Sequence, residues 1–360
     1  MNARLRYGIP AAALVLISAG AVLVAANTSP ARLGARATDP QHLPVGERAG
    51  RLDGATGWIN SPPLAPGDLA GKVVVYDFWT YSCVNCVRTL PYVRAWYDRY
   101  GRDGLVVVGV HSPEFDFEHV RANVEAATHR LGVTWPVVLD NQKAIWDTFA
   151  NNYWPADYVA DRDGHIRYKH IGEGGYQETE DVLRNLLGVD PASERASSPG
   201  GGAGTDAAAG PDDKITPETY LGTERGTARA RPGLVTYPEP GPLAAGDCRL
   251  AGPWGAEEQK VTAAAAGAAI VLAYRAGEVN LVMTPPKAGA VDVQVELDGQ
   301  PLPPPFRTED TKVDDSGSTV VHVDHDGLYR IVLGSRVEEH TVRLTARQPE
   351  VAAFAFTFGP

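Results

Sequence analysis

Two cysteines separated by two residues stand between a predicted strand and a predicted helix, and this arrangement constrains the fold more than any other feature of the sequence. Residues 73–78 (VVVYDF) are almost entirely apolar and have the length of a buried central strand. Residues 87–100 carry apolar or aromatic side chains at helical spacing. Because Cys83 and Cys86 lie between these segments, we expect both thiols at the start of a helix that follows a strand of an α/β sheet.

The start of a helix favours redox chemistry of a cysteine pair. Its unpaired backbone N–H groups and the positive end of the helix dipole stabilise a thiolate relative to a thiol. The two intervening residues place Cys86 one helical turn beyond Cys83, within disulfide distance. We therefore predict that Cys83 is the attacking thiolate and that Cys86 resolves the mixed disulfide. A redox-active Cys83–Cys86 disulfide would then serve the reaction without a bound cofactor.

Metal binding and peroxide reduction are alternative uses of such a pair, and an inert structural disulfide is a third. A zinc site needs about four ligands, and the sequence offers no second Cys or His pair at a suitable spacing, so we predict no metal site. A copper chaperone would need a third ligand, for which His111 and His170 are candidates. A thiol peroxidase would also use a cysteine at a helix start, but the adjacent second thiol favours disulfide exchange.

The segments around the pair predict an α/β domain with a mixed sheet flanked by helices. After the first strand and helix, the predicted elements are a strand at 105–111, a helix at 117–131, a strand at 137–140, a helix at 142–151, a hairpin of strands at 156–160 and 165–171, and a helix at 177–187. The hairpin has turn residues at 161–164, and the last helix stops at Gly188.

Composition divides the chain into five segments. Residues 193–211 consist mainly of Ala, Ser and Gly, which cannot bury enough apolar surface to order the segment. We predict a membrane anchor or signal peptide at 1–28, a tether at 29–57, the α/β domain at 58–190, a flexible linker at 191–213 and a second domain at 214–360. The 33 basic and 44 acidic residues give a net charge of −11, which argues against nucleic acid as a partner.

The N-terminus predicts export. Arg4 and Arg6 precede residues 7–26, which carry no charge and match the length of about 20 residues that crosses a bilayer as a helix. The positive flank keeps the N-terminus in the cytoplasm and places both domains on the extracytoplasmic side of the cell membrane, in a single-pass arrangement. Small residues at 24–26 leave a cleaved signal peptide as the alternative, in which case the protein would be secreted.

The C-terminal segment predicts an all-β domain. Residues 292–297 and 337–344 alternate between apolar and polar side chains, and turn residues separate such stretches. Short strands at regular spacing indicate a β-sandwich, and the alanine-rich stretch 261–269 is the only helix that the pattern indicates. Three aromatic residues could contact carbohydrate or cell wall, although rings in a sandwich more often form its core: Trp254, Tyr274 and Tyr329. We expect Cys248 to be a small buried side chain.

Several motifs resemble the thioredoxin superfamily, in its membrane-tethered TlpA/ResA-like branch, and more closely the exported C-terminal region of DipZ-type proteins. Residues 77–91, 109–115 and 152–155 carry the resemblance (DFWTYSCVNCVRTLP, GVHSPEF and NYWP). The resemblance is strong over 58–188 and weaker through the C-terminal half. It implies a thioredoxin-like domain followed by a carbohydrate-binding-module-like sandwich of jelly-roll type.

The resemblance implies roles for four residues. Asp77 stands where thioredoxin has a buried aspartate beside the second cysteine, and it would accept the proton of Cys86, because burial raises the pKa of a carboxyl group. Trp79 matches the tryptophan that packs beneath the active site. Trp154 and Pro155 match the cis-proline loop, whose backbone pairs with an extended substrate peptide. We therefore predict Asp77 as a catalytic residue and the other three as substrate-binding residues.

The sequence departs from that branch at positions that bear on proton and electron transfer. TlpA/ResA-like reductases have a glutamate three residues after the second cysteine, where this chain has Thr89. Proton transfer would rely on Asp77, or on Glu114 after the second predicted strand, and we count Glu114 among the predicted substrate-binding residues as well. Pro91 matches the proline that kinks the helix. DipZ-type proteins receive electrons through a multi-helix membrane domain. With one candidate span here, we expect a separate membrane electron-transfer partner.

The cysteine pair and the resemblance together imply a protein dithiol–disulfide oxidoreductase. Its expected substrates are exported proteins with thiols or disulfides, including thiols that await haem attachment in cytochrome c biogenesis. The resemblance favours a reductase. The dipeptide Val84-Asn85 differs from the Gly-Pro of thioredoxin, so the reduction potential of thioredoxin does not apply to this chain.

Overall fold

The computed structural model describes residues 46–190, 192–196, 215–226 and 228–360. The predicted anchor or signal peptide lies outside these ranges, as do the first part of the predicted tether and most of the predicted linker. Along the described part of the chain, no helix is both long and apolar enough to span a membrane.

The first domain is built on a mixed six-stranded sheet with the order β1-β4-β3-β2-β5-β6. Its strands are β1 (Gly57–Ile59), β2 (Val73–Trp79), β3 (Leu105–His111), β4 (Val137–Leu139), β5 (Ala156–Ala160) and β6 (Ile166–Ile171). Strands β2, β3 and β4 run parallel, whereas β1, β5 and β6 pair antiparallel with their neighbours. The predicted mixed sheet is therefore confirmed.

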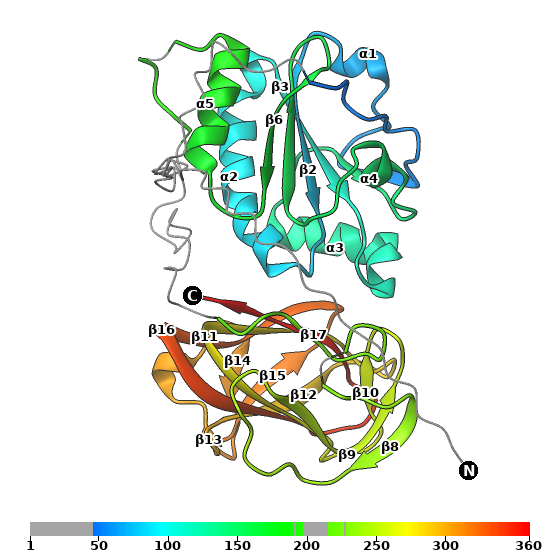
Figure 1. Ribbon diagram of the computed structural model, residues 1–360, viewed down its shortest axis with the longest axis vertical. Coiled ribbons are helices and arrows are strands. Elements are labelled where there is room, and N and C mark those ends of the chain that lie inside the picture. The colour runs from blue at the N-terminus through cyan, green and yellow to red at the C-terminus, as the bar shows by residue number, and fades with distance from the viewer. Residues whose placement is uncertain (1–45, 191, 197–214, 227) are drawn as a thin grey trace, which may run out of the picture. The chain divides into compact units, whose positions relative to one another are not determined.

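Helices cover both faces of this sheet, and α2 and α5 lie side by side against one of them (Figure 1). The α-helices are α1 (Pro66–Leu69), α2 (Val84–Tyr100), α3 (Arg121–Leu131), α4 (Ala144–Thr148) and α5 (Tyr176–Leu187), with 3₁₀ turns η2 (Gly101–Asp103) and η3 (Asp116–His119). Compared with the predictions, α2 begins earlier, at the cysteines, and α4 is shorter. The helix predicted at 117–131 is divided, because Val120 is extended between η3 and α3.

Alternate residues of β2 point to opposite faces of the sheet, and this alternation positions the site. Val75 and Trp79 pack in the core cluster that contains Cys86 and residues of α2, α3 and α5. Tyr76 and Phe78 pack on the other face, with α4. The side chain of Asp77 is therefore directed to the face covered by α2.

The packed domain extends beyond its predicted boundaries of 58 and 190. On the N-terminal side, the backbone of Arg48 forms an isolated antiparallel β-bridge with His165. Leu52 packs against the hydrophobic core cluster that contains residues of α4. On the C-terminal side, the backbone N–H of Ala196 donates a hydrogen bond to Glu180 of α5 at 2.7 Å. Residues 46–57 of the predicted tether and 192–196 of the predicted linker are thus held on the domain, by contacts too distant in sequence for composition to indicate.

The second domain consists of antiparallel strands linked into one eleven-stranded sheet. The order is β14-β15-β12-β16-β11-β17-β10-β9-β8, with β13 beside β12 and β7 beside β17. The strands are β7 (Thr219–Tyr220), β8 (Gly233–Tyr237), β9 (Cys248–Ala256), β10 (Val261–Ala263), β11 (Ala269–Thr284), β12 (Val291–Leu297), β13 (Gln300–Pro301), β14 (Thr311–Val313), β15 (Thr319–Val323), β16 (Gly327–Ala346) and β17 (Ala352–Gly359), with a 3₁₀ turn η4 (Pro304–Phe306). The predicted all-β domain is confirmed, and its jelly-roll type stays a prediction.

The prediction of a helix at 261–269 is wrong. Val261 and Ala263 belong to β10 and face the core, and the chain then turns into β11 at Ala269. Alanine has a high helix propensity, but pairing with β9 and β17 satisfies the backbone of this segment as a strand.

The aromatic residues that were candidates for carbohydrate contact lie in the core of the second domain. Trp254, Tyr274 and Tyr329 are each no more than 2% exposed and pack in one cluster. These rings therefore serve as core and present no face to a sugar. Cys248 lies in the same cluster, where burial raises the pKa of its thiol to about 12, so it is the small buried side chain that we expected.

Candidate active site

The cysteine pair lies at the start of α2, as the sequence predicts. Cys83 is the N-cap residue of α2, and its Sγ accepts a hydrogen bond from the backbone N–H of Cys86 at 3.2 Å. Cys83 is half-buried, whereas Cys86 is completely buried. Burial raises the pKa of the Cys86 thiol well above its ordinary value, and a hydrogen bond between the two thiol groups adds to this shift. The two thiol groups are thus neighbours, and Sγ of Cys83 lies against a backbone N–H of the helix start.

A buried carboxyl group, Glu118, holds the segment that precedes the first cysteine. It accepts hydrogen bonds from the hydroxyl groups of Ser82, at 2.6 Å, and Thr80. It also accepts from the backbone N–H groups of Glu114 at 2.6 Å and Phe115 at 2.9 Å. Burial raises the pKa of Glu118, although these hydrogen bonds oppose the shift. Glu118 therefore ties the loop before α2 to the loop after β3.

His111, at the end of β3, belongs to the same network. Its Nε2 lies 3.3 Å from Thr80 Oγ1, and its ring stacks on Tyr81 at 5.6 Å between centroids. The ring of Trp79 stands perpendicular to it at 5.5 Å. Because burial lowers the pKa of His111 to about 3, the imidazole is neutral at physiological pH. His111 thus supports the loop as an uncharged group.

Two further carboxyl groups lie on the side of the second cysteine. Asp77 of β2 and Asp157 of β5 face each other in the antiparallel strand pair, and both are buried. Within the described ranges, no protein group donates a hydrogen bond to either oxygen of Asp77 or to Oδ1 of Asp157. Burial raises the pKa of Asp77 well above its ordinary value, and the neighbouring carboxyl of Asp157 adds to the shift. Asp77 in turn raises the pKa of Cys86, so the predicted proton acceptor lies beside the second thiol.

Helix α2 contains Thr89, where the sequence departs from TlpA/ResA-like proteins, and Pro91, where it agrees with them. The hydroxyl of Thr89 donates a hydrogen bond to the carbonyl oxygen of Cys86 at 2.7 Å, so it supports the backbone of the helix start. Pro91 lies inside the helix and cannot donate the usual backbone hydrogen bond. Thr89 and Pro91 therefore both act on the backbone of α2.

The predicted substrate-binding residues fall into two environments. The Trp154–Pro155 peptide bond is cis, as predicted. Trp154 is half-buried, and its Nε1 donates a hydrogen bond to the carbonyl oxygen of Ser112 at 3.1 Å. Trp79 is completely buried in the cluster that contains Cys86. Trp79 therefore packs beneath the site and does not present a surface to a substrate.

The carboxylate of Glu114, the fourth predicted substrate-binding residue, makes its hydrogen bonds away from the cysteines. Its Oε1 accepts hydrogen bonds from the hydroxyl of Tyr220 and from Nη1 of Arg225, both at 2.9 Å. These partners belong to the second domain. Glu118, four residues further along the chain, provides the carboxyl group beside the loop of the cysteines.

An ion network continues from the helix start. Arg88, two residues after Cys86, donates hydrogen bonds from Nη1 to Glu173 at 3.1 Å and from Nη2 to Glu278 of β11 at 2.6 Å. The Arg88 and Glu278 side chains are 16% and 12% exposed, so water screens this pair only partly. The active-site helix is thereby joined to the second domain by charge.

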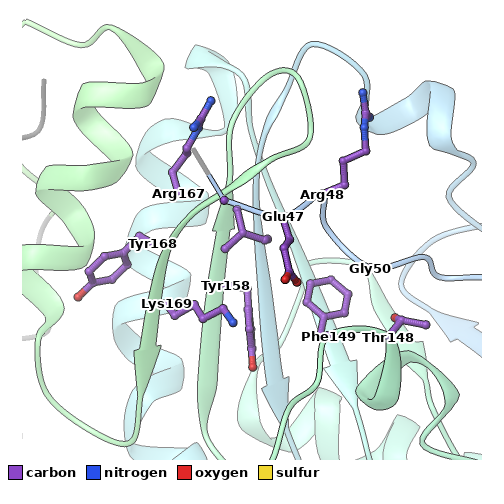
Figure 2. Close-up of a pocket in the computed structure, with 11 residues that line it drawn as sticks. Glu47, Arg48, Gly50, Thr148, Phe149, Tyr158, Arg167, Tyr168 and Lys169 are labelled. Carbon is purple, nitrogen blue, oxygen red and sulfur yellow. The ribbon is translucent and has the colours of Figure 1, made fainter. Parts of the chain in front are cut away.

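A pocket at the edge of the sheet lies apart from the cysteines. It has a volume of about 320 Å³, and its lining includes Arg48, Phe149, Tyr158 and Lys169 (Figure 2). Tyr158 packs on the face of the sheet opposite to the face that holds Cys86. No cysteine lines this pocket.

Sequence reasoning missed Glu118 and Asp157. Asp157 carried a signal, because it is the one charged residue in the predicted strand 156–160 (ADYVA), and a charge in a buried strand is costly without a partner or a function. Glu118 carried no such signal. It lies near the start of the helix predicted at 117–131, where a glutamate is ordinary.

Comparison with known proteins relates both domains to described families. Residues 63–187 match the family described as Redoxin, and residues 216–359 match the family described as Thioredoxin like C-terminal domain. The chain is 36% identical to Protein DipZ of Mycobacterium tuberculosis over 316 residues, which make up 86% of this chain and 42% of DipZ. It therefore spans less than half the length of that relative.

Smaller relatives correspond to the first domain alone. The chain is 33% identical to thiol-disulfide oxidoreductase YkuV of Bacillus subtilis over 138 residues, which make up 38% of this chain and 91% of YkuV. A solution structure of a thioredoxin-like protein in the oxidised form is 30% identical, with coverage of 40% of this chain and 97% of that chain and a TM-score of 0.37. Since YkuV is 33% identical and is matched over 91% of its length, this chain belongs to the thioredoxin-like thiol–disulfide oxidoreductase family.

Proposed function

We propose that this protein is a dithiol–disulfide oxidoreductase that reduces disulfides of exported proteins through Cys83 and Cys86. The arrangement of the two sulfurs at the start of α2 carries the proposal. Cys83 Sγ is half-buried and accepts the N–H of Cys86, whereas the Cys86 thiol is completely buried. A substrate can therefore reach the first sulfur directly and the second only through the first.

The reaction takes place in two exchanges. In the first, the Cys83 thiolate attacks one sulfur of a substrate disulfide and forms a mixed disulfide, and the other substrate sulfur leaves as a thiolate. In the second, Cys86 attacks Cys83 Sγ, the Cys83–Cys86 disulfide forms, and the remaining substrate thiolate is released. Two electrons pass from the enzyme dithiol to the substrate disulfide.

The second exchange requires removal of the Cys86 proton. The raised pKa of this thiol leaves it protonated at neutral pH. Asp77 acts on Cys86 through its charge, and none of the described protein groups donates a hydrogen bond to its oxygens. Asp77 accepts the proton and then returns it, by way of solvent, to the departing substrate thiolate.

Copper carriage on the same scaffold is less well supported by the positions of the histidines. His111 is completely buried and lies against Thr80, and Nε2 of His170 lies 3.3 Å from the carbonyl oxygen of Glu173. Across the described ranges, no three His, Cys, Asp or Glu side chains are grouped to hold a metal ion. Thiol peroxidase activity is likewise favoured by no specific feature of the site.

The cellular setting of the proposal rests on the N-terminal sequence and on the relatives. We place both domains on the extracytoplasmic side of the cell membrane, joined to it by residues 7–26, because Arg4 and Arg6 precede this uncharged stretch. A membrane partner supplies electrons and reduces the Cys83–Cys86 disulfide after each cycle. Protein thiols that await haem attachment are the substrates that the TlpA/ResA resemblance suggests.

Reduction of a protein disulfide tests the activity. With dithiothreitol as the electron donor, the purified full chain should accelerate the reduction of insulin. Cys83→Ser should abolish the acceleration. Cys86→Ser, reduced beforehand and separated from dithiothreitol, should accumulate a mixed disulfide with insulin that is visible on a non-reducing gel. Cys248→Ser, which removes the buried thiol of the second domain, is the matched control and should keep the wild-type rate.

Equilibration with thiol–disulfide buffers tests the direction of electron flow. A reduction potential near that of thioredoxin, about −270 mV, would support a reductase, and one near about −120 mV would instead indicate an oxidant. The proposed activity is wrong if the wild-type chain reduces insulin no faster than dithiothreitol alone and Cys86→Ser captures no substrate.

A further inference from the structure

The carboxyl pair beneath α2 is unusual in its surroundings. Asp77 and Asp157 are register partners on adjacent antiparallel strands, so their side chains leave the same face of the sheet next to each other. This is the face of the core cluster that contains Cys86. Two like charges at such a position, out of water, cannot both be ionised without a large energetic cost.

The neighbouring groups do not compensate for a second negative charge. Cys86 of α2 lies beside Asp77, Tyr168 and His170 belong to the adjacent strand β6, and Tyr176 comes from α5. Burial and the neighbouring carboxyl are the influences that act on Asp77, and burial is the one that acts on Asp157. No lysine or arginine is among them. Among described groups, the oxygens Oδ1 and Oδ2 of Asp77 and Oδ1 of Asp157 have no hydrogen-bond donor.

We propose that Asp77 and Asp157 share one proton, and that Asp157 acts as a positioning residue that determines the pH range in which Asp77 accepts the proton of Cys86. The inference rests on the proposed function, since it concerns the resolving step of disulfide exchange. It adds to that function a second carboxyl group with a separate task. The geometry that carries it is the pairing of two carboxyl groups across β2 and β5, beside a buried thiol, with no described donor to either oxygen of Asp77 or to Oδ1 of Asp157.

The resolving step conserves both protons and electrons. Before it, the pair holds one proton and one negative charge, and Cys86 holds its thiol proton. As the S–S bond between Cys83 and Cys86 forms and the bond between Cys83 and the substrate sulfur breaks, the Cys86 proton moves to the charged carboxyl. The pair then holds two protons and no charge, and the substrate leaves as a thiolate. One proton passes to solvent and protonates that thiolate.

Asp157 also provides the exit for this proton. Asp77 is 0% exposed and Asp157 is 8% exposed, so of the two residues only Asp157 reaches the surface. Transfer between two adjacent carboxyl groups that already share a proton needs no movement of the backbone. Asp77 is therefore the carboxyl beside the thiol, and Asp157 is the member of the pair that is nearer to the surface.

Two-phase kinetics with the full chain test the proposal. An aromatic disulfide whose thiolate product is coloured, such as dithiobis-nitrobenzoate, releases one coloured thiolate when Cys83 attacks and a second when Cys86 resolves the mixed disulfide. The rate of the second phase is measured from about pH 5 to about pH 9. In Asp157→Asn, the loss of the neighbouring charge should lower the midpoint of the second phase by about one pH unit or more. The first phase should change less than about two-fold.

Matched variants separate this effect from loss of structure. Asp163→Asn changes an exposed carboxyl in the turn between β5 and β6 and should reproduce the wild-type profile. In an Asp77→Asn background, Asp157→Asn should produce no further shift, because it acts through Asp77. If Asp157→Asn folds poorly, Asp157→Ser serves in its place. An active variant with an unshifted second phase would overturn the proposal, whereas a wild-type chain with no second phase would instead contradict the proposed function.

Discussion

Two sets of buried carboxyl groups flank the cysteine pair, and their surroundings are opposite. On the side of Cys83, Glu118 accepts hydrogen bonds from two hydroxyl groups and from backbone N–H groups. On the side of Cys86, Asp77 accepts no hydrogen bond from any described protein group, and Asp157 Oδ1 accepts none either. All three side chains are buried, and burial raises the pKa of each of them.

This contrast distinguishes a carboxyl group that holds the structure in place from one that can accept a proton during the reaction. A carboxylate whose lone pairs are occupied by donors fixes the position of those donors, and protonation would disturb the hydrogen bonds it accepts. A carboxyl without donors has lone pairs that are free to take up a proton from a neighbouring thiol. Burial and a raised pKa do not distinguish the two kinds, whereas the hydrogen-bond partners do.

The largest effect is expected for Glu118→Ala. The substitution leaves the hydroxyl groups of Thr80 and Ser82 and the N–H groups of the loop after β3 without their acceptor, and each buried unsatisfied group costs about 1–3 kcal/mol. Since water can enter the space that is created and hydrate some of these groups, we expect a loss of about 3 kcal/mol in the free energy of unfolding. Chemical denaturation of both proteins measures this difference.

Glu125→Ala provides the control for that experiment. Glu125 is an exposed residue of α3 that pairs with Arg121 at 2.8 Å, and removal of a surface ion pair should cost about 0–1 kcal/mol. If the variants Glu118→Ala and Glu125→Ala were equally stable, Glu118 would not hold the loop in the manner described.

The second prediction concerns Asp77→Asn and affects the rate more than the stability. Without the proton acceptor, the resolving attack by Cys86 should slow by about 100-fold, within the range found for general acid–base catalysis. The attack by Cys83 should change by only about two- or three-fold, because its thiolate is supported by the helix start. Stopped-flow measurement of both phases tests this prediction, and equal slowing of the two phases would contradict it.

Much of the fold could be predicted because strands and helices of the first domain carry strong periodic patterns. The apolar run at 73–78, the helical spacing at 87–100 and the position of the cysteines between them determine where the thiols lie. The alternation at 292–297 likewise predicts β12 correctly. The alanine-rich stretch 261–269 could not be predicted by the same means, since pairing with distant strands outweighs its local helix propensity.

The site could be predicted only in part, because two of its carboxyl groups depend on contacts between distant segments. Asp157 approaches Asp77 through strand pairing across 80 residues of chain, and Glu118 approaches Ser82 across 36. A charge near a predicted helix start gives no sign of such a partner. This is why the sequence predicts a role beside the thiols for Glu114, which lies within the resembling stretch 109–115. Its carboxylate instead accepts hydrogen bonds from Tyr220 and Arg225.

The third prediction uses the dependence of stability on pH. The ordinary pKa of an aspartate is 3.8, and burial raises that of Asp157 to about 7. The folded chain therefore holds this proton more tightly than the unfolded chain, so its contribution to stability is complete below about pH 4 and is lost as the pH rises through about 7. Asp157→Asn should be more stable than wild type above that range, by about 2 kcal/mol or roughly 4–8 °C in Tm.

Thermal unfolding of Asp157→Asn, Asp163→Asn and wild type at several pH values tests the sign of this effect. The exposed Asp163 should not contribute, so its variant should follow the wild-type curve. A gain in Tm for Asp157→Asn that is the same at acid and alkaline pH would mean that the carboxyl does not titrate in the folded chain as described.

The smallest effect is expected for Arg88, which adds a third kind of carboxyl environment to the comparison. Here Glu173 and Glu278 are compensated by a cation instead of by neutral donors or by a shared proton. A double-mutant cycle of Arg88→Met and Glu278→Gln should give a coupling energy of about 1 kcal/mol, because Arg88 keeps Glu173 when Glu278 is neutralised. The coupling should change little between low and high salt, since both side chains are mostly buried. A coupling that disappears in high salt would indicate a solvated surface pair, and the active-site helix would then not be joined to the second domain by this contact.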